Sequence, residues 1–361
     1  MSALFPGIGG DRPFLVAEIG KNFIQTPDER PVDECIHNAI VLIDAATDAG
    51  ADAVKFQTHV VDDEQMPLPI TSPHAKELDR YAWVSRNTRA TPRAFWDAIT
   101  GHCKTRGITF FSTPMSRGGA RVLQPYDPPF WKVSSGDVLD FVLLDTLRKT
   151  GKPVILSTGM VSRAELRSAV DFLAAAGSPI GILYCISEYP CPPETFNLAT
   201  IPELHATYPD AVIGFSDHSL GFEAAMAASA LGAVVIEKHF SLSRDLWGPD
   251  HKVSMTPTEF SAMAEAVRSK TYERVDSRSF LGQKDREFDG ATNRFRPYFH
   301  KALVAGQDIP AGAILTGEEI MALRPASMID GLSSQRFPDA IGKTTIRDHR
   351  ALDPITISSF H

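Results

Sequence analysis

The run PVILSTG (153–159) and the stretch AELRSAVDFLAAAG (164–177) that follows it form the unit on which the predicted fold depends. The first is short and almost wholly apolar, which is typical of a parallel strand buried on both faces. The second has helical periodicity and ends on a glycine suited to a helix C-cap. Similar apolar runs occur at FLVAEIG (14–20), DAVKFQT (52–58), ITFFSTP (108–114), FWKVSS (130–135), IGILYCIS (180–187), VIGFSD (212–217) and VVIEKHF (234–240). Eight strand–helix units, ending with PTEFSAMAEAVRSKTYERV (257–275), predict a (β/α)8 TIM barrel rather than an open doubly wound sheet.

The pattern changes after residue 275. We expect residues 1–275 to form the barrel, the charged stretch 276–294 to be a linker, and residues 295–361 to form a small separate domain. Short β-like runs broken by Gly and Pro indicate that this last domain is rich in β-structure. Its acidic and basic side chains balance, so it is not a basic arm for nucleic acid.

Composition excludes several classes of protein. The 361 residues are 43% hydrophobic and 22% charged, with a net charge of −8, which argues against a nucleic-acid or anionic-membrane partner. The N-terminus lacks a signal-peptide pattern, and no apolar run reaches the roughly 18 residues of a membrane helix. The cysteines lack CxxC spacing and are expected to be reduced thiols: Cys35, Cys103, Cys185 and Cys191. We therefore expect a cytoplasmic protein.

The ends of the predicted strands are unusually polar. In a barrel the C-terminal ends of the strands form the catalytic face, and buried polar groups are costly unless they are paired or used. The side chains at these ends are Glu18, Lys55, Gln57, Thr113, Lys132, Ser135, Asp137, Ser187, Tyr189, Asp217, His218, Glu237, Lys238 and His239. Together they predict an active site.

Two pairs of residues at these ends indicate the chemistry. His218 and His239 follow neighbouring strands, so their imidazoles can converge on one metal ion, with positions left for water and substrate. Lys55 and Lys132 lie within apolar runs and must point into the site. There they can neutralise a phosphate or carboxylate, or one of them can form a Schiff base as in an aldolase.

Eight segments of the barrel form a specific set: AEIGKN (17–22), AVKFQTH (53–59), FFSTPMSR (110–117), KVSSGD (132–137), PVILSTGM (153–160), IGFSDHSLG (213–221), VIEKHF (235–240) and GPDH (248–251). In these segments the chain resembles the sialic acid synthase family, which includes N-acetylneuraminate, legionaminate and pseudaminate synthases. The C-terminal segments IPAGAILTGEEI and RPASM resemble the family's antifreeze-like SAF domain.

The resemblance implies a role for each matching residue. His218 and His239 match two metal ligands, usually for Mn²⁺, and Glu18 matches a catalytic carboxylate. Phosphoenolpyruvate is held at positions that match Lys55, Thr113, Lys132, Ser135, Ser187 and Ser216. The sugar is contacted at positions that match Gln57, Asp137, Tyr189, Asp250 and Arg324, with the arginine reaching the partner subunit of a domain-swapped homodimer.

The implied reaction joins phosphoenolpyruvate to the aldehyde of an amino sugar such as N-acetylmannosamine, with release of phosphate. Two residues depart from the family pattern, since Asp137 stands where Glu is usual and Ser187 where Asn is usual. Two segments depart as well: GKNFIQ stands for the usual GxNHxG, so Phe23 replaces a histidine, and RPASM stands for RPGNG. Both lie on the sugar side, which suggests that the acceptor is not plain N-acetylmannosamine. Two other functions are considered, a Schiff-base pyruvate aldolase and a non-enzymatic carbohydrate- or ice-binding protein.

Overall fold

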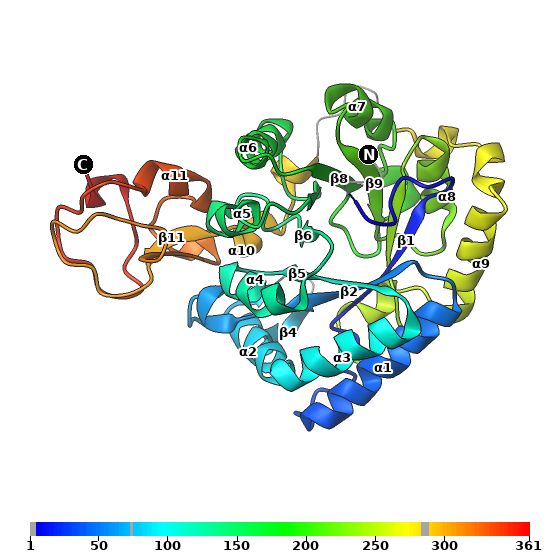
Figure 1. Cartoon of the computed structure of the whole chain (residues 1–361), viewed down its shortest axis with the longest axis horizontal. Helices are drawn as coiled ribbons and strands as arrows, with labels where there is room; N and C mark the ends of the chain where they lie inside the picture. Colours follow the sequence, from blue (N-terminus) through cyan, green and yellow to red (C-terminus); the bar gives the residue numbers. More distant parts are fainter. Residues whose placement is uncertain (1–4, 73–74, 283–288) are drawn as a thin grey trace.

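Eight parallel strands form a nearly closed barrel in the computed structural model of the chain, which describes residues 5–72, 75–282 and 289–361 (Figure 1). The strand order is β5-β2-β1-β10-β9-β8-β7-β6, and the end strands β5 and β6 are in contact without a hydrogen-bonded ladder. The strands are β1 (Phe14–Gly20), β2 (Ala53–Thr58), β5 (Thr109–Pro114), β6 (Trp131–Val133), β7 (Val154–Ser157), β8 (Ile180–Cys185), β9 (Val212–Asp217) and β10 (Val235–His239). The predicted TIM-barrel fold is therefore confirmed.

Helices surround the barrel and cover the outer faces of its strands (Figure 1). They are α1 (Val32–Asp48), α2 (Arg80–Ala90), α3 (Arg93–Arg106), α4 (Arg117–Leu123), α5 (Phe141–Arg148), α6 (Arg163–Ala174), α7 (Thr200–Thr207), α8 (Glu223–Ala230) and α9 (Pro257–Arg268). The sequence pattern does not predict the hairpin of β3 (Thr71–Ser72) and β4 (Ala75–Asp79), nor helix α2, which together form an insertion after β2.

Strand periodicity divides the barrel interior into an apolar layer and a polar layer. In β1, Phe14 and Val16 belong to a buried cluster inside the barrel, and Glu18 follows on the same face. The residues between them pack outward against the helices. The other barrel strands add Ala53, Phe111, Ile155, Leu183, Val212 and Val235 to the inner cluster, and Phe130, just before β6, joins them with Phe5 and Ile8. Inward-facing positions nearer the strand ends are mostly polar, so the fold itself gathers the polar side chains at one mouth of the barrel.

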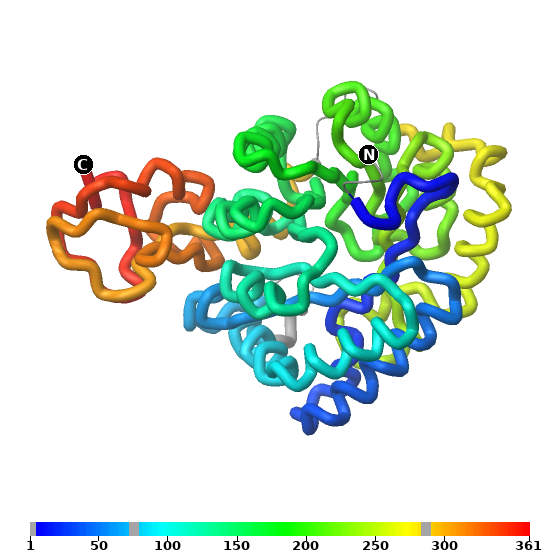
Figure 2. Tube along the Cα trace, viewed as in Figure 1, coloured from blue at the N-terminus to red at the C-terminus, as the bar shows by residue number. Residues whose placement is uncertain are grey.

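A small domain follows the barrel and packs against α4 and α5 (Figure 1). It contains the antiparallel strands β11 (Ala302–Ala305) and β12 (Ile320–Leu323) and two short helices, α10 (Arg296–Phe299) and α11 (Phe337–Ala340). The chain ends on this domain, far from the N-terminus (Figure 2). The predicted linker 276–294 includes residues 283–288, which lie outside the described residues.

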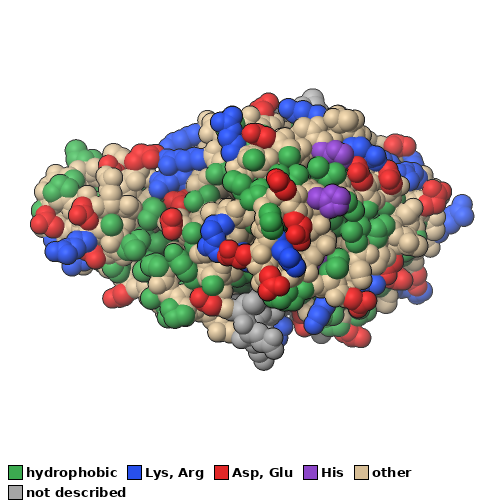
Figure 3. All heavy atoms as spheres, turned by 90° about the horizontal axis from the view of Figure 1, so that it is seen from below, with side chains coloured by type: hydrophobic (Ala, Val, Ile, Leu, Met, Phe, Trp, Pro, Cys, Tyr) green, Lys and Arg blue, Asp and Glu red, His purple; other side chains and the backbone are tan. Residues whose placement is uncertain are grey.

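The outer surface carries charges of both signs. On the face shown in Figure 3, acidic and basic side chains are interspersed rather than gathered by sign. Within the described ranges, none of the helices is long and apolar enough to span a membrane.

Candidate active site

A small, deep pocket of about 80 Å³ lies at the C-terminal ends of the barrel strands. In the sheet register, Glu18 of β1 is paired with Lys55 of β2 on one side and with His239 of β10 on the other. These three residues therefore lie side by side on adjacent strands. Ten of the predicted site residues line this pocket: Glu18, Lys55, Gln57, Thr113, Lys132, Ser135, Tyr189, Ser216, His218 and His239. The buried Ser187 lies just behind it, with its Oγ 3.3 Å from that of Ser135.

Two carboxylates flank the buried ammonium group of Lys55. Its Nζ is 2.9 Å from Glu237 Oε1 and 3.3 Å from Glu18 Oε2. Glu18 also accepts a hydrogen bond of 2.8 Å from Gln57, and Glu237 accepts one of 2.9 Å from Ser216. This arrangement gives the two carboxylates different environments.

The pKa values of these carboxylates are shifted in opposite directions. Burial raises the pKa of Glu18 to about 7, and Lys55 only partly offsets this effect. Burial also disfavours the Glu237 carboxylate, but Lys55 and Lys132 outweigh it and hold its pKa at about 2. At neutral pH, Glu237 is therefore ionised and Glu18 can exchange a proton, as expected for a general acid–base residue.

Lys132 is the second cation of the deep pocket. Its Nζ donates to Ser157 Oγ at 2.7 Å and to the Val133 carbonyl at 3.1 Å. Burial lowers its pKa to about 8. A mostly protonated lysine surrounded by hydroxyl groups is suited to hold an oxyanion such as phosphate or carboxylate.

The two histidines face each other across the pocket. Their ring centroids are 5.4 Å apart, and the Tyr189 ring lies 4.2 Å from that of His218. Nδ1 of His218 is 2.7 Å from the Ile186 carbonyl, which leaves its Nε2 as an acceptor. Nδ1 of His239 is buried and has no hydrogen-bond partner in the described part of the chain, and burial lowers the pKa of this side chain.

A neutral imidazole with one unprotonated ring nitrogen that accepts no hydrogen bond is a suitable ligand for a divalent ion. In metal sites the other ring nitrogen is commonly fixed by a backbone carbonyl, as it is at His218. The residues present therefore fit a metal held by two histidines. No group of three or more His, Cys, Asp or Glu side chains is arranged for a metal among the described residues, so water and substrate would complete the coordination.

Asp137 and Arg324 lie together, but they do not line either of the two pockets at the barrel mouth. Arg324, from the end of β12, is fully buried and donates a hydrogen bond to Asp137, and its Nε is 3.9 Å from Glu64. Lys301 joins them, with its Nζ 3.1 Å from Asp137 Oδ1 and 2.6 Å from Asp140 Oδ2. In this chain Arg324 thus contacts its own barrel, and the swapped homodimer stays a prediction.

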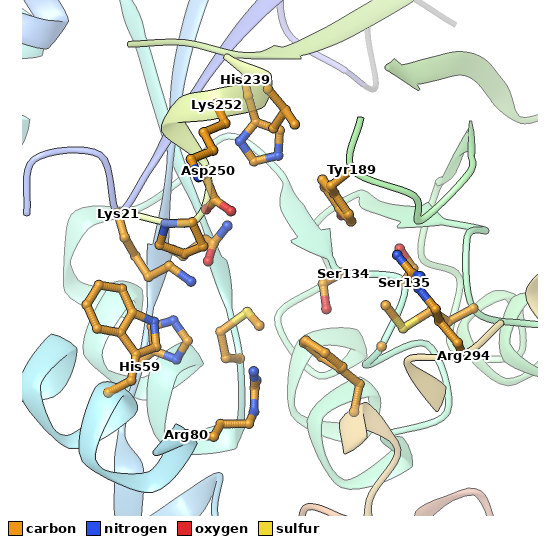
Figure 4. A pocket seen from close by; sticks show the side chains of 18 of the residues that line it. Lys21, His59, Arg80, Ser134, Ser135, Tyr189, His239, Asp250, Lys252 and Arg294 are labelled. Atoms are coloured by element: carbon orange, nitrogen blue, oxygen red, sulfur yellow. The ribbon is translucent and has the colours of Figure 1, made fainter. Parts of the chain in front are cut away.

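A wider outer pocket of about 360 Å³ adjoins the deep one, and Figure 4 shows side chains that line it. Six residues line both pockets: Gln57, Met115, Ser134, Ser135, Tyr189 and His239. Of the predicted sugar-contacting residues, Asp250 also lies here. The deep pocket can hold a small anion, and the outer pocket has room for a larger polar molecule next to it.

The sequence assigns no role to several residues of the two pockets. Ser157 and Cys185 follow the same alternation as the predicted residues, each at an inward position near a strand end, and so does Glu237, which is named above only as a polar strand-end residue. That periodicity is a signal that could have identified them. The cations of the outer pocket come from loops and helix α2, where strand periodicity gives no such signal.

Comparisons with known proteins identify relatives of the barrel and of the small domain. The model of the NeuB family matches residues 42–277, and that of the SAF domain matches residues 300–360. The spore coat polysaccharide biosynthesis protein SpsE of Bacillus subtilis is 32% identical over 339 residues, which cover 91% of this chain and 88% of that protein. Its crystal structure matches with a TM-score of 0.80 and 29% identity, over 99% of this chain and 98% of the other.

Two further relatives are named for their products. A pseudaminic acid synthase of Campylobacter jejuni is 30% identical over 357 residues, or 96% of each protein. The crystal structure of an N-acetylneuraminic acid (sialic acid) synthetase from Leptospira borgpetersenii, in complex with citrate, is 30% identical with a TM-score of 0.62. It covers 74% of this chain and 85% of that one.

Proposed function

The chain belongs to the NeuB family, and on that premise we propose that it condenses phosphoenolpyruvate with an amino-sugar aldehyde to give a nonulosonate and phosphate. The family membership confirms the resemblance expected from the motifs. One observation carries the proposal: two lysines, several hydroxyls and two histidines share one deep pocket that opens into a larger one. The relatives named as pseudaminic acid and sialic acid synthases support it.

Phosphoenolpyruvate would occupy the deep pocket. Lys132 and Lys55 would offset the charges of its phosphate and carboxylate, and the hydroxyls of Thr113, Ser135 and Ser216 would donate hydrogen bonds to its oxygens. Thr113 Oγ1 is buried without a hydrogen-bond partner in the described part of the chain, so it is available for such a contact. Ser187, behind Ser135, would support this hydroxyl set.

His218 and His239 are the residues that would hold a divalent ion, and we propose Mn²⁺, the usual ion of the family that the motifs resemble. A bound divalent ion supplies polarisation of the aldehyde carbonyl. The His239 imidazole lies at the boundary between the two pockets, since it lines both, and His218 lines the deep pocket. The aldehyde end of an acceptor in the outer pocket would therefore meet C3 of phosphoenolpyruvate at this boundary.

Glu18 would handle the protons of the reaction. As C3 of phosphoenolpyruvate bonds to the aldehyde carbon, the carboxyl group gives its proton to the aldehyde oxygen, which becomes a hydroxyl. Water then adds to C2, and Glu18 takes back one of its protons. The C2–O bond to phosphate breaks, and the remaining proton leaves with phosphate as the C2 ketone forms. A pKa of about 7 suits both transfers.

A single experiment tests this function. Purified protein with Mn²⁺, phosphoenolpyruvate and a panel of six-carbon amino sugars should release phosphate and form a product whose mass is that of the joined substrates. Phosphate release should stop in EDTA. If no sugar in the panel consumes phosphoenolpyruvate, the proposal is wrong. If borohydride instead traps pyruvate on Lys132 or Lys55 and activity survives EDTA, the protein is a Schiff-base aldolase.

A further inference from the structure

The outer pocket has an excess of positive charge. Its lining includes four cationic side chains, Lys21, Arg80, Lys252 and Arg294, and a single carboxylate, Asp250. Lys21 and Arg80 lie on the same side of the pocket, opposite Tyr189 (Figure 4). Lys252 and Arg294 are exposed near its opening. A pocket for a neutral sugar has no need of this charge.

Arg80 is the buried cation that favours an anionic ligand in the outer pocket most strongly. Its side chain is buried, with 8% exposure, and its guanidinium lies 4.1 Å from the centre of the Phe299 ring. Within the described ranges, its Nε has no hydrogen-bond partner and its guanidinium forms no ion pair with a carboxylate. Burial lowers the pKa of Arg80 to about 10, and Arg324 adds to this effect. A buried charge without a direct partner is costly, and an anionic ligand would remove that cost.

Lys21 approaches the same space from the end of β1. Gly20, with a φ of +55°, turns the chain there, and the partly buried side chain of Lys21 follows. Its Nζ lies 5.8 Å from the centre of the Trp83 ring, and it forms no ion pair with any described residue. The planar guanidinium of Arg80 and the compact ammonium group of Lys21 thus face the same part of the pocket.

The deep pocket does not need these cations. It carries two lysines, Lys55 and Lys132, against two carboxylates, Glu18 and Glu237, together with the hydroxyls described above. Neither Lys21 nor Arg80 lines it. Their charge is therefore placed for the molecule in the outer pocket rather than for phosphoenolpyruvate.

We propose that the acceptor sugar carries an anionic group, a phosphate monoester or a carboxylate, at the end remote from its aldehyde, and that Lys21 and Arg80 bind this group. The inference rests on the proposed condensation. With the aldehyde at the histidine pair, the far end of the sugar points toward these two cations, while Lys252 and Arg294 attract it at the opening. The group takes no part in bond formation and serves to hold the acceptor.

Three acceptors that differ at one carbon test the proposal on the wild-type protein: N-acetylmannosamine, its 6-phosphate, and the 6-carboxylate N-acetylmannosaminuronic acid. Phosphoenolpyruvate consumption and product mass give kcat/KM for each. We expect an anionic acceptor to exceed the neutral one by about 100-fold, the effect of two charge-assisted hydrogen bonds. A preference for the 6-phosphate or for the 6-carboxylate identifies the group. If N-acetylmannosamine is used best, or if none of the three is used, the inference is overturned. The condensation fails only if no sugar of the wider panel consumes phosphoenolpyruvate.

Variants then assign the effect to residues. Lys21→Met and Arg80→Gln should each raise KM for the anionic acceptor about tenfold or more, with KM for phosphoenolpyruvate unchanged. Arg89→Gln is the matched control, because Arg89 lies on α2 with Arg80 but is exposed and pairs with Glu29. Lys21→Met provides the test if Arg80→Gln does not fold. Equal losses for phosphoenolpyruvate and acceptor would overturn the assignment.

Discussion

Replacing Lys301 by methionine should destabilise the protein by about 3–5 kcal/mol, the usual cost of removing one partner from a buried ion pair. The Lys301 side chain is completely buried, and its Nζ lies 2.6 Å from Asp140 Oδ2, 3.1 Å from Asp137 Oδ1 and 2.6 Å from the Met115 carbonyl. Methionine keeps most of the volume of the stem, so the loss is one of charge and hydrogen bonds rather than of packing. Asp137 retains Arg324 and the Ser134 hydroxyl, whereas among the described residues Asp140 retains only the backbone N–H of Leu143.

The loss of stability caused by Lys301→Met should also depend on pH, in the direction set by the pKa of Asp140. Burial raises the pKa of this carboxyl even with Lys301 present, and removing Lys301 raises it further. A raised carboxyl pKa favours the folded state at low pH, and this advantage is lost as pH rises through the folded pKa. The destabilisation of Lys301→Met relative to wild type should therefore shrink as pH falls from about 8 to about 5.

Urea unfolding measures these differences. Adding Asp140→Asn to Lys301→Met should recover about 1–3 kcal/mol, because asparagine keeps the bond to Leu143 and needs no counterion. Lys343→Met, which removes an exposed lysine of the same domain, should stay within about 0.5 kcal/mol of wild type. A loss below about 1 kcal/mol for Lys301→Met, or no recovery in the double variant, would refute the reasoning.

Three other variants test the site and the linkage between the domains. His239→Ala should abolish turnover and weaken Mn²⁺ binding in calorimetric titrations, and unchanged metal affinity would contradict the ligand assignment. Lys132→Ala should raise KM for phosphoenolpyruvate about 10–100-fold but leave KM for the acceptor within about twofold, so equal effects in steady-state kinetics would count against a phosphate role. Glu165→Gln should lower the thermal midpoint at pH 7: burial opposes the Glu165 carboxylate, but Arg296 and Ser162 hold its pKa at about 2. That stabilisation is present above the usual pKa near 4.5 and is lost as pH falls toward 2, so the two melting curves should converge there, and a constant gap would contradict the ion-pair account.

The barrel could be predicted because its strands obey a simple rule. A strand buried on both faces must be apolar along most of its length, and β1 and β9 are buried throughout. Eight such runs in the sequence are enough to predict an eight-stranded sheet, even when no contact between residues is known. The hairpin of β3 and β4 follows no such rule, because it lies outside the barrel and its short strands do not need continuous apolar residues.

The deep half of the site could be predicted for the same reason. Lys55, Lys132 and His239 sit at inward positions near strand ends, so the period of the strand alone places them in one pocket. Glu237 obeys the same period, two residues before His239, so the sequence also places it among the polar strand ends. Its role beside Lys55 becomes clear only when the register of β1, β2 and β10 is known.

The acceptor half of the site depends on packing that no local pattern encodes. Arg80 reaches the outer pocket because α2 packs near α10, which brings Phe299 of the small domain against its guanidinium. Arg324 and Asp137 are 187 positions apart and meet only when the small domain docks on the barrel. Phosphoenolpyruvate would thus be held by residues that the barrel fixes by itself, whereas the acceptor would meet residues placed by an insertion and by a second domain. Changes in those two segments can therefore alter the acceptor without disturbing the groups that carry out the condensation.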